Sequence, residues 1–233
     1  IAKYYEANLS RLAANFAFCS DVGLTMGGGI KTAEFISGRY ADILSNLYMG
    51  YACLWFYEQN KHVKGLDKVL ELAMADCCKE IQEAFFGLFS NFPVPLMGPV
   101  MRAFTFPRGR EYHDASDKLR RSVATMITTP SEVRALLTDG VFVSKNPEDR
   151  VNQIARALPL AYQADLYLAA CRKEKRQPTA AEKEVIDQAE ALREQIIQVD
   201  VFQMLAGKDH RAEHMKPTWK VEPVEGSKAE AAH

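Results

Sequence analysis

The sequence predicts an all-α protein: a helical bundle with a peripheral C-terminal helical hairpin and a disordered tail. Apolar residues recur at spacings of three and four along most of the chain, the pattern of helices that bury one face. Proline and glycine clusters separate these segments and predict where the helices end. With 233 residues, 48% of them hydrophobic and 25% charged, the composition is that of a globular protein with a substantial core. We expect one helical domain over residues 1–206 and a disordered tail over residues 207–233.

The net charge and the cysteine content limit which partners the protein can bind and where in the cell it is expected. The formal net charge is -1, so the chain lacks the excess of Lys and Arg that nucleic-acid binding needs. The five cysteines form no C-x-x-C motif and are expected to be reduced, buried thiols. No apolar run reaches the ~20 residues that cross a bilayer. We expect a cytoplasmic protein, with inner-membrane association as an open alternative, and a piece of a longer polypeptide because the chain begins Ile-Ala-Lys.

Two long helices are predicted before residue 60. The first covers residues 4–26, and Gly27-Gly28-Gly29 ends it because glycines carry a large entropic cost inside a helix. We favour a helix break or a tight packing site there over a flavin or phosphate loop, since no strand precedes the glycines. The second helix covers residues 30–59 and keeps a wide apolar stripe, and the spacing of Arg39 and Asp42 lets them pair on its surface. The expected buried face of the first helix comprises Leu9, Leu12, Ala13, Phe16, Ala17 and Val22.

A third helix is predicted over residues 66–90, and the two prolines of Asn91-Phe92-Pro93-Val94-Pro95 end it. The segment 96–106 that follows is short, unusually apolar and bounded by prolines. We favour a buried connecting helix here, with a surface wedge that touches a membrane or another subunit as the alternative. The apolar positions of the third helix are Leu70, Met74, Cys77, Cys78, Ile81, Phe85 and Phe89.

Capping residues predict four further helices. Ser116 or Asp117 begins one that ends at Thr128, and Pro130 or Ser131 begins one that ends near Gly140. The peripheral hairpin, residues 147–205, has one helix to about Cys171 and another that Thr179 caps. The charged run 172–176 is interpreted as the solvated end of a helix, and Val141-Phe142-Val143 is too short to support a sheet.

No local pattern specifies catalysis. The chain contains no G-x-S-x-G, Walker A or E-x-x-H motif, and no carboxylate is singled out as a base. His210 and His214 stand four apart but lack the H-E-x-x-H context, so we interpret them as incidental tail residues. We therefore assign no catalytic, cofactor-binding or metal-binding residue.

Several segments, in order, resemble the C-terminal region of bacterial long-chain acyl-CoA dehydrogenases of the FadE type. The most informative is the cationic turn Phe106-Pro107-Arg108-Gly109-Arg110, with Tyr112, Ser116, Asp117 and Leu119 after it. The similarity runs to about Arg176, and the combination is specific although each piece alone is not. The other segments are Gly27 to Lys31, Ile36 to Tyr48, Asn91 to Pro93, Asn146 to Asp149 and Ala155 to Leu158.

The resemblance implies that the intact protein oxidises long-chain acyl-CoA to trans-2-enoyl-CoA in fatty acid β-oxidation. A glutamate would take the α-proton and FAD would accept the β-hydride, with both the glutamate and most of the FAD site in the region that precedes this chain. This chain would then be an accessory helical domain. Its expected partners are the remainder of the dehydrogenase, the acyl-CoA substrate of the intact enzyme and a second copy of the chain. The competing hypothesis is a stand-alone helical module for protein interaction or membrane docking.

One surface is a candidate for contact with a membrane or another subunit. It combines apolar side chains with cations, as a peripheral contact with anionic lipid requires. The alternative is that the apolar helices shield a subunit interface or the far end of the acyl chain. The candidate residues are Phe92, Leu96, Met97, Met101, Arg102, Phe104, Phe106, Arg108 and Arg110.

Overall fold

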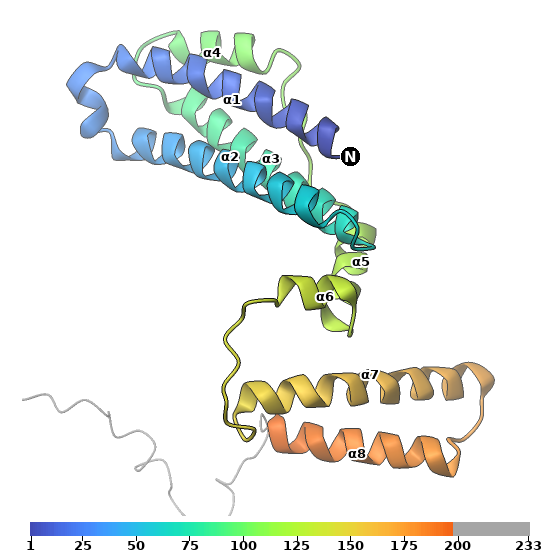
Figure 1. The fold of residues 1–233 in the computed structure, drawn as a ribbon. Coiled ribbons are helices and arrows are strands. Elements are labelled where there is room, and N and C mark those ends of the chain that lie inside the picture. The colour runs from blue at the N-terminus through green and yellow to red at the C-terminus, as the bar shows by residue number, and fades with distance from the viewer. Residues whose placement is uncertain (198–233) are drawn as a thin grey trace, which may run out of the picture.

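The computed structural model describes residues 1–197 and is all helical, as predicted, without a strand in that range (Figure 1). The predicted tail, the last predicted turns of the final helix, and His210 and His214 lie outside the described residues. The elements are α1 (Ala2–Leu24), the 3₁₀ turn η1 (Gly27–Lys31), α2 (Glu34–Asn60), α3 (Leu66–Asn91), α4 (Met97–Thr105), α5 (Asp117–Thr128), α6 (Glu132–Leu137), α7 (Arg150–Glu174) and α8 (Ala180–Ile196).

Helices α1 to α4 form the bundle (Figure 1). Helices α2 and α3 make the longest contact, α1 packs against both, and α4 lies against α3 and α1. The predicted face of α3 is confirmed, since all seven of its apolar positions are buried. On α1, Leu9 and Leu12 are fully buried as predicted, whereas Ala17 is exposed because only part of the apolar face meets a neighbour.

The three glycines after α1 break the helix, as predicted. They form η1, where Gly27 has a φ of 54° that favours glycine. Apart from the adjacent backbone, no atom lies within 4 Å of the position a Cβ would take at any of the three, so the segment is a break and not a tight packing site. Because η1 occupies this stretch, α2 begins at Glu34 and not at Ile30.

The predicted Arg39–Asp42 pair is replaced by other contacts. The Nη1 atom of Arg39 donates a hydrogen bond to the carbonyl oxygen of Phe35, 3.2 Å away. A Cβ added at Gly87 of α3 would lie 2.8 Å from the Nε atom of Arg39, so this guanidinium fills the space that the glycine leaves. Packing between α2 and α3 therefore turns the arginine away from its neighbour in sequence.

Helix α4 approaches α3 so closely that only glycine fits at one position. A Cβ added at Gly98 would lie 1.9 Å from the carbonyl oxygen of Phe89, a backbone atom that cannot move independently. The buried side of α4 is Gly98, Met101 and Thr105, and the hydroxyl of Thr105 donates to the Met101 carbonyl. The segment 96–106 is thus an amphipathic connecting helix with one buried face and one exposed face.

Caps predicted from the sequence begin the later helices. Ser116 and Ser131 accept hydrogen bonds from the backbone N–H groups of Leu119 and Arg134, and α6 ends at Leu137, three residues before Gly140. Residues 141–143 are exposed and form no strand.

The predicted hairpin of α7 and α8 is present, and its two helices pack against each other (Figure 1). Asp149 caps α7, and Thr179 with Glu182 forms a capping box at the start of α8. The run 172–176 ends α7, but its last residue is not simply solvated. Arg176 ion-pairs with Glu182 at 2.6 Å, and this guanidinium, with the Thr179 N–H, lowers the pKa of Glu182 to about 2.

We predict that Gly98→Ala lowers the free energy of unfolding by about 2 kcal/mol, because the added methyl forces α4 away from α3. Urea titration of the two proteins measures the change. Gly28→Ala is the matched control and should shift stability by no more than about 0.5 kcal/mol, since the space around Gly28 is open. Equal stabilities of the Gly98 variant and the parent protein would contradict the close approach.

Candidate functional site

An aromatic cluster fixes the turn after α4 to the bundle. Phe106 is buried, and its ring centroid lies 5.4 Å from that of Phe85, 5.5 Å from Phe86 and 6.1 Å from Phe89. Met101 is also fully buried. These two members of the predicted contact surface, Met101 and Phe106, therefore belong to the core in this structure.

Gln82 of α3 holds the backbone of the same turn. Only 1% of Gln82 is exposed, and its Oε1 atom accepts hydrogen bonds from the N–H groups of Glu111 and Tyr112 at 2.7 and 2.9 Å. Its Nε2 atom donates to the Tyr112 carbonyl at 2.9 Å. Because residues 110–116 form no helix, their backbone groups need such partners where the turn meets α3.

The cations of the turn have different roles. Arg110 makes a two-point ion pair with Glu83, at 2.9 and 2.8 Å, and its guanidinium lies 4.3 Å from the ring centroid of Phe86. Those hydrogen bonds lower the pKa of the Glu83 carboxyl below its ordinary value. Arg102 lies over the same ring at 5.5 Å. Arg108 is exposed.

The outer side of α4 is the first exposed apolar surface. We define the α4 face as Leu96, Val100, Phe104 and the neighbouring Phe18 of α1, whose ring centroid lies 5.8 Å from that of Phe104. Phe104 is 75% exposed. Leu96 has a φ of 65°, a conformation that strains a leucine. Of the other predicted residues, Phe92 and Met97 are half-buried.

The outer side of α2 is the second exposed apolar surface, and it is larger than the α4 face. We define the α2 face as Leu44, Tyr48, Tyr51 and Trp55, all of which are exposed. They follow one another at helical spacings of four, three and four residues, which places them on one side of α2. The sequence from Ile43 to Tyr57 contains no charged residue and no histidine. The α2 face therefore lies within a helix segment that has no charged residue of its own.

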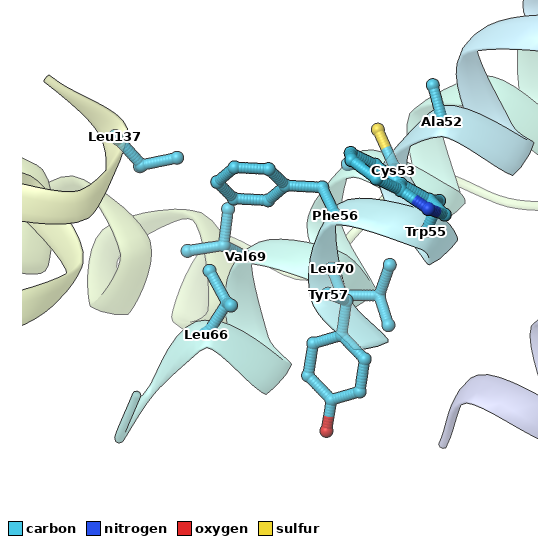
Figure 2. Close-up of a pocket in the computed structure, with 10 residues that line it drawn as sticks. Ala52, Cys53, Trp55, Phe56, Tyr57, Leu66, Val69, Leu70 and Leu137 are labelled. Carbon is cyan, nitrogen blue, oxygen red and sulfur yellow. The ribbon is translucent and has the colours of Figure 1, made fainter. Parts of the chain in front are cut away.

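An apolar pocket adjoins the α2 face. It has a volume of about 410 Å³ and lies between α2, α3 and Leu137 of α6, with the Phe56 ring directed toward Leu137 (Figure 2). Partial burial raises the pKa of the Cys53 thiol in its wall. The lining residues are Ala52, Cys53, Trp55, Phe56, Tyr57, Leu66, Val69, Leu70, Ala73 and Leu137.

The two apolar faces and the pocket are better suited to packing against a partner than to catalysis or metal binding. The pocket wall carries no carboxylate, histidine or cation. Over residues 1–197 no cluster of His, Cys, Asp and Glu side chains could hold a metal ion. No helix in the same range is long and apolar enough to cross a membrane. All five cysteines are free thiols; four are buried as predicted, whereas Cys53 is half-buried, and burial raises the pKa of Cys19 and Cys78 to about 12.

Sequence reasoning missed the α2 face and the pocket as surfaces. It identified the apolar stripe of α2 but assigned none of those residues to a contact site. The available signal was the uncharged run from Ile43 to Tyr57, because a helix that is apolar all round needs neighbours on every side. Only Ile43, Leu47, Gly50 and Leu54 of that run are buried.

The fold and its two apolar faces define a helical domain with surfaces suited to packing against a partner. Residues 1–213 match the family described as "Acyl-CoA dehydrogenase, C-terminal, bacterial type". The match covers most of the chain, so the chain belongs to this family, and the resemblance found in the sequence is confirmed. No solved structure matches the chain.

We predict that Gln82→Met lowers the free energy of unfolding by about 3 kcal/mol, because it keeps the side-chain volume but leaves buried backbone groups of the turn unpaired. Chemical denaturation measures the loss. Gln59→Met, at an exposed position of α2, is the control and should leave stability unchanged. Similar midpoints for both variants would show that the turn does not depend on Gln82.

Proposed function

We propose that this chain is the accessory C-terminal domain of a flavin-dependent acyl-CoA dehydrogenase that acts in fatty acid β-oxidation. The observation that carries the proposal is the family match over residues 1–213. The reaction is the oxidation of a long-chain acyl-CoA to the trans-2-enoyl-CoA. The domain contributes structure, and the catalytic glutamate and most of the FAD site belong to the region that precedes it.

The chemistry of the described residues supports this division of roles. Removal of the α-proton needs a base beside the substrate, and the pocket wall offers none. A flavin pyrophosphate needs cations or a helix N-terminus, and the pocket is lined almost wholly by hydrocarbon. The residues of the pocket do not fit FAD, so we derive no step of the reaction from them.

The test is made on the intact protein. We expect it to carry FAD and to convert palmitoyl-CoA to the enoyl-CoA, while the present chain alone binds no flavin and turns over no substrate. Flavin absorbance measures the bound FAD, and dye-linked dehydrogenation measures the conversion of palmitoyl-CoA. Stoichiometric FAD on the isolated chain, or an intact protein with neither flavin nor activity, would refute the proposal.

A second candidate function is peripheral docking on the inner membrane through the α4 face. The observation that favours it is that exposed Leu96 and Phe104 occur in the same short segment as exposed Arg102 and Arg108, since apolar anchors and cations together bind anionic lipid. A cytoplasmic protein would then be held reversibly at the membrane surface. A stand-alone interaction module is the remaining alternative, and dehydrogenase segments encoded before Ile1 would exclude it.

For this candidate we predict that Phe104→Asp weakens co-sedimentation of the intact protein with anionic vesicles by about tenfold, because a charge replaces an apolar anchor. Phe142→Asp is the matched control, since Phe142 is as exposed but lies outside the α4 face. Equal binding of the two variants, or no binding by the parent protein, would exclude the α4 face as a membrane contact.

A further inference from the structure

We propose that the α2 face and the adjoining pocket form the surface on which the preceding dehydrogenase portion of the same polypeptide packs. This inference rests on the proposed function, because it needs that portion to exist. It assigns the contact to a specific helix face, one that contains none of the residues that sequence reasoning selected.

The first argument is the composition of the face. Tyr48 is 76% exposed and Trp55 is 67% exposed, and Tyr51 lies between them on the same side of α2. Aromatic residues and methionine are enriched in the cores of protein interfaces, and charged residues are depleted there. Trp and Tyr, together with Arg, are also enriched among the few residues that dominate the binding energy of such interfaces. An uncharged, aromatic stripe of this length is typical of a buried contact.

The second argument separates a protein partner from lipid. Peripheral membrane surfaces place Lys or Arg beside their apolar anchors. Arg102 and Arg108 lie in or next to α4, whereas the cation beside the α2 face, Lys3 at its Trp55 end, shares a groove with the carboxylates Glu6 and Glu58. Arg39, the nearest arginine of α2, is turned toward the Phe35 carbonyl and Gly87. The α2 face thus fits an apolar protein surface better than anionic head groups.

The third argument concerns which protein covers the α2 face. Helix α1 runs antiparallel to α2, so the start of the chain lies beside the aromatic end of the α2 face (Figure 1). A single groove is lined by Ala2, Lys3 and Glu6 of α1 together with Tyr51, Leu54, Trp55 and Glu58 of α2. The hydroxyls of Ser10 and Tyr51 lie 3.4 Å apart, which ties the two helices together there.

This placement favours the preceding portion of the same polypeptide over a separate protein as the partner of the α2 face. In a C-terminal domain the rest of the polypeptide joins through the first helix, and here that junction opens next to Trp55. A covalent link gives the joined portion a high effective concentration at the surface closest to the junction. The pocket beyond Trp55 can receive an apolar side chain of that portion, since its wall is almost wholly apolar.

The test is hydroxyl-radical footprinting of the intact, flavin-loaded protein. We expect labelling of Tyr48 and Trp55 to fall about tenfold below what their exposure in this domain allows, because an interface core excludes water. Phe35 is the internal reference: it lies on the same helix, is 85% exposed and is outside the α2 face, so it should label fully. In Trp55→Asp, labelling of Tyr48 should rise again, whereas Phe35→Asp should leave it low.

The outcomes separate this inference from the proposed function. If the intact protein dehydrogenates palmitoyl-CoA but Tyr48 and Trp55 label as readily as Phe35, the inference is overturned and the proposed function stands. Protection that disappears with a fall in oligomeric state identifies a second copy as the occupant, and protection that needs added vesicles identifies lipid; both overturn the inference. An intact protein without flavin or activity refutes the proposed function and the inference with it.

Discussion

The contact between α3 and the irregular stretch that follows α4 constrains much of the bundle. Phe106 enters the aromatic cluster of α3, and Gln82 binds three backbone groups of Glu111 and Tyr112. Burial of a phenylalanine contributes about 1.5–3 kcal/mol, and the hydrogen bonds remove the cost of burying unpaired backbone groups. These contacts hold the stretch between α4 and α5 on the surface of α3. The surface ion pairs around them, such as Arg110–Glu83 and Lys79–Asp114, are exposed and contribute little stability by comparison.

With that turn in place, the bundle leaves two apolar surfaces uncovered, and their electrostatics differ. The α4 face is short and has arginines nearby, while the α2 face is long and lies in a segment without charge. Leaving large aromatic side chains in water is unfavourable, so both surfaces are best understood as contacts completed by something outside the described residues. Membership in a family of dehydrogenase C-terminal domains agrees with that interpretation, because such a domain belongs to a larger enzyme.

Sequence reasoning succeeded where a local signal decides the structure. The break at Gly27-Gly28-Gly29, the caps at Ser116, Ser131 and Thr179, and the seven buried positions of α3 all follow from propensity or periodicity. It was less successful where contact with a neighbouring helix determines the position of a side chain. The Arg39 side chain contacts the Phe35 carbonyl and fills the space over Gly87. A rule that pairs charged residues by their spacing along one helix predicts neither contact. The segment 96–106 was treated as a choice between buried and exposed, whereas α4 is both, since Gly98 lets one side lie directly on the backbone of α3.

The sequence by its own pattern determined the set of helices, most of their ends and the family, because capping residues, breakers, apolar period and motif order are all present along the chain. Which apolar faces are covered depends on the tertiary structure. Periodicity identifies a face that avoids water, but the number of helices available to cover it depends on how the bundle packs. For α2 two neighbours cover one side, and Tyr48 and Trp55 on the other side remain in solvent.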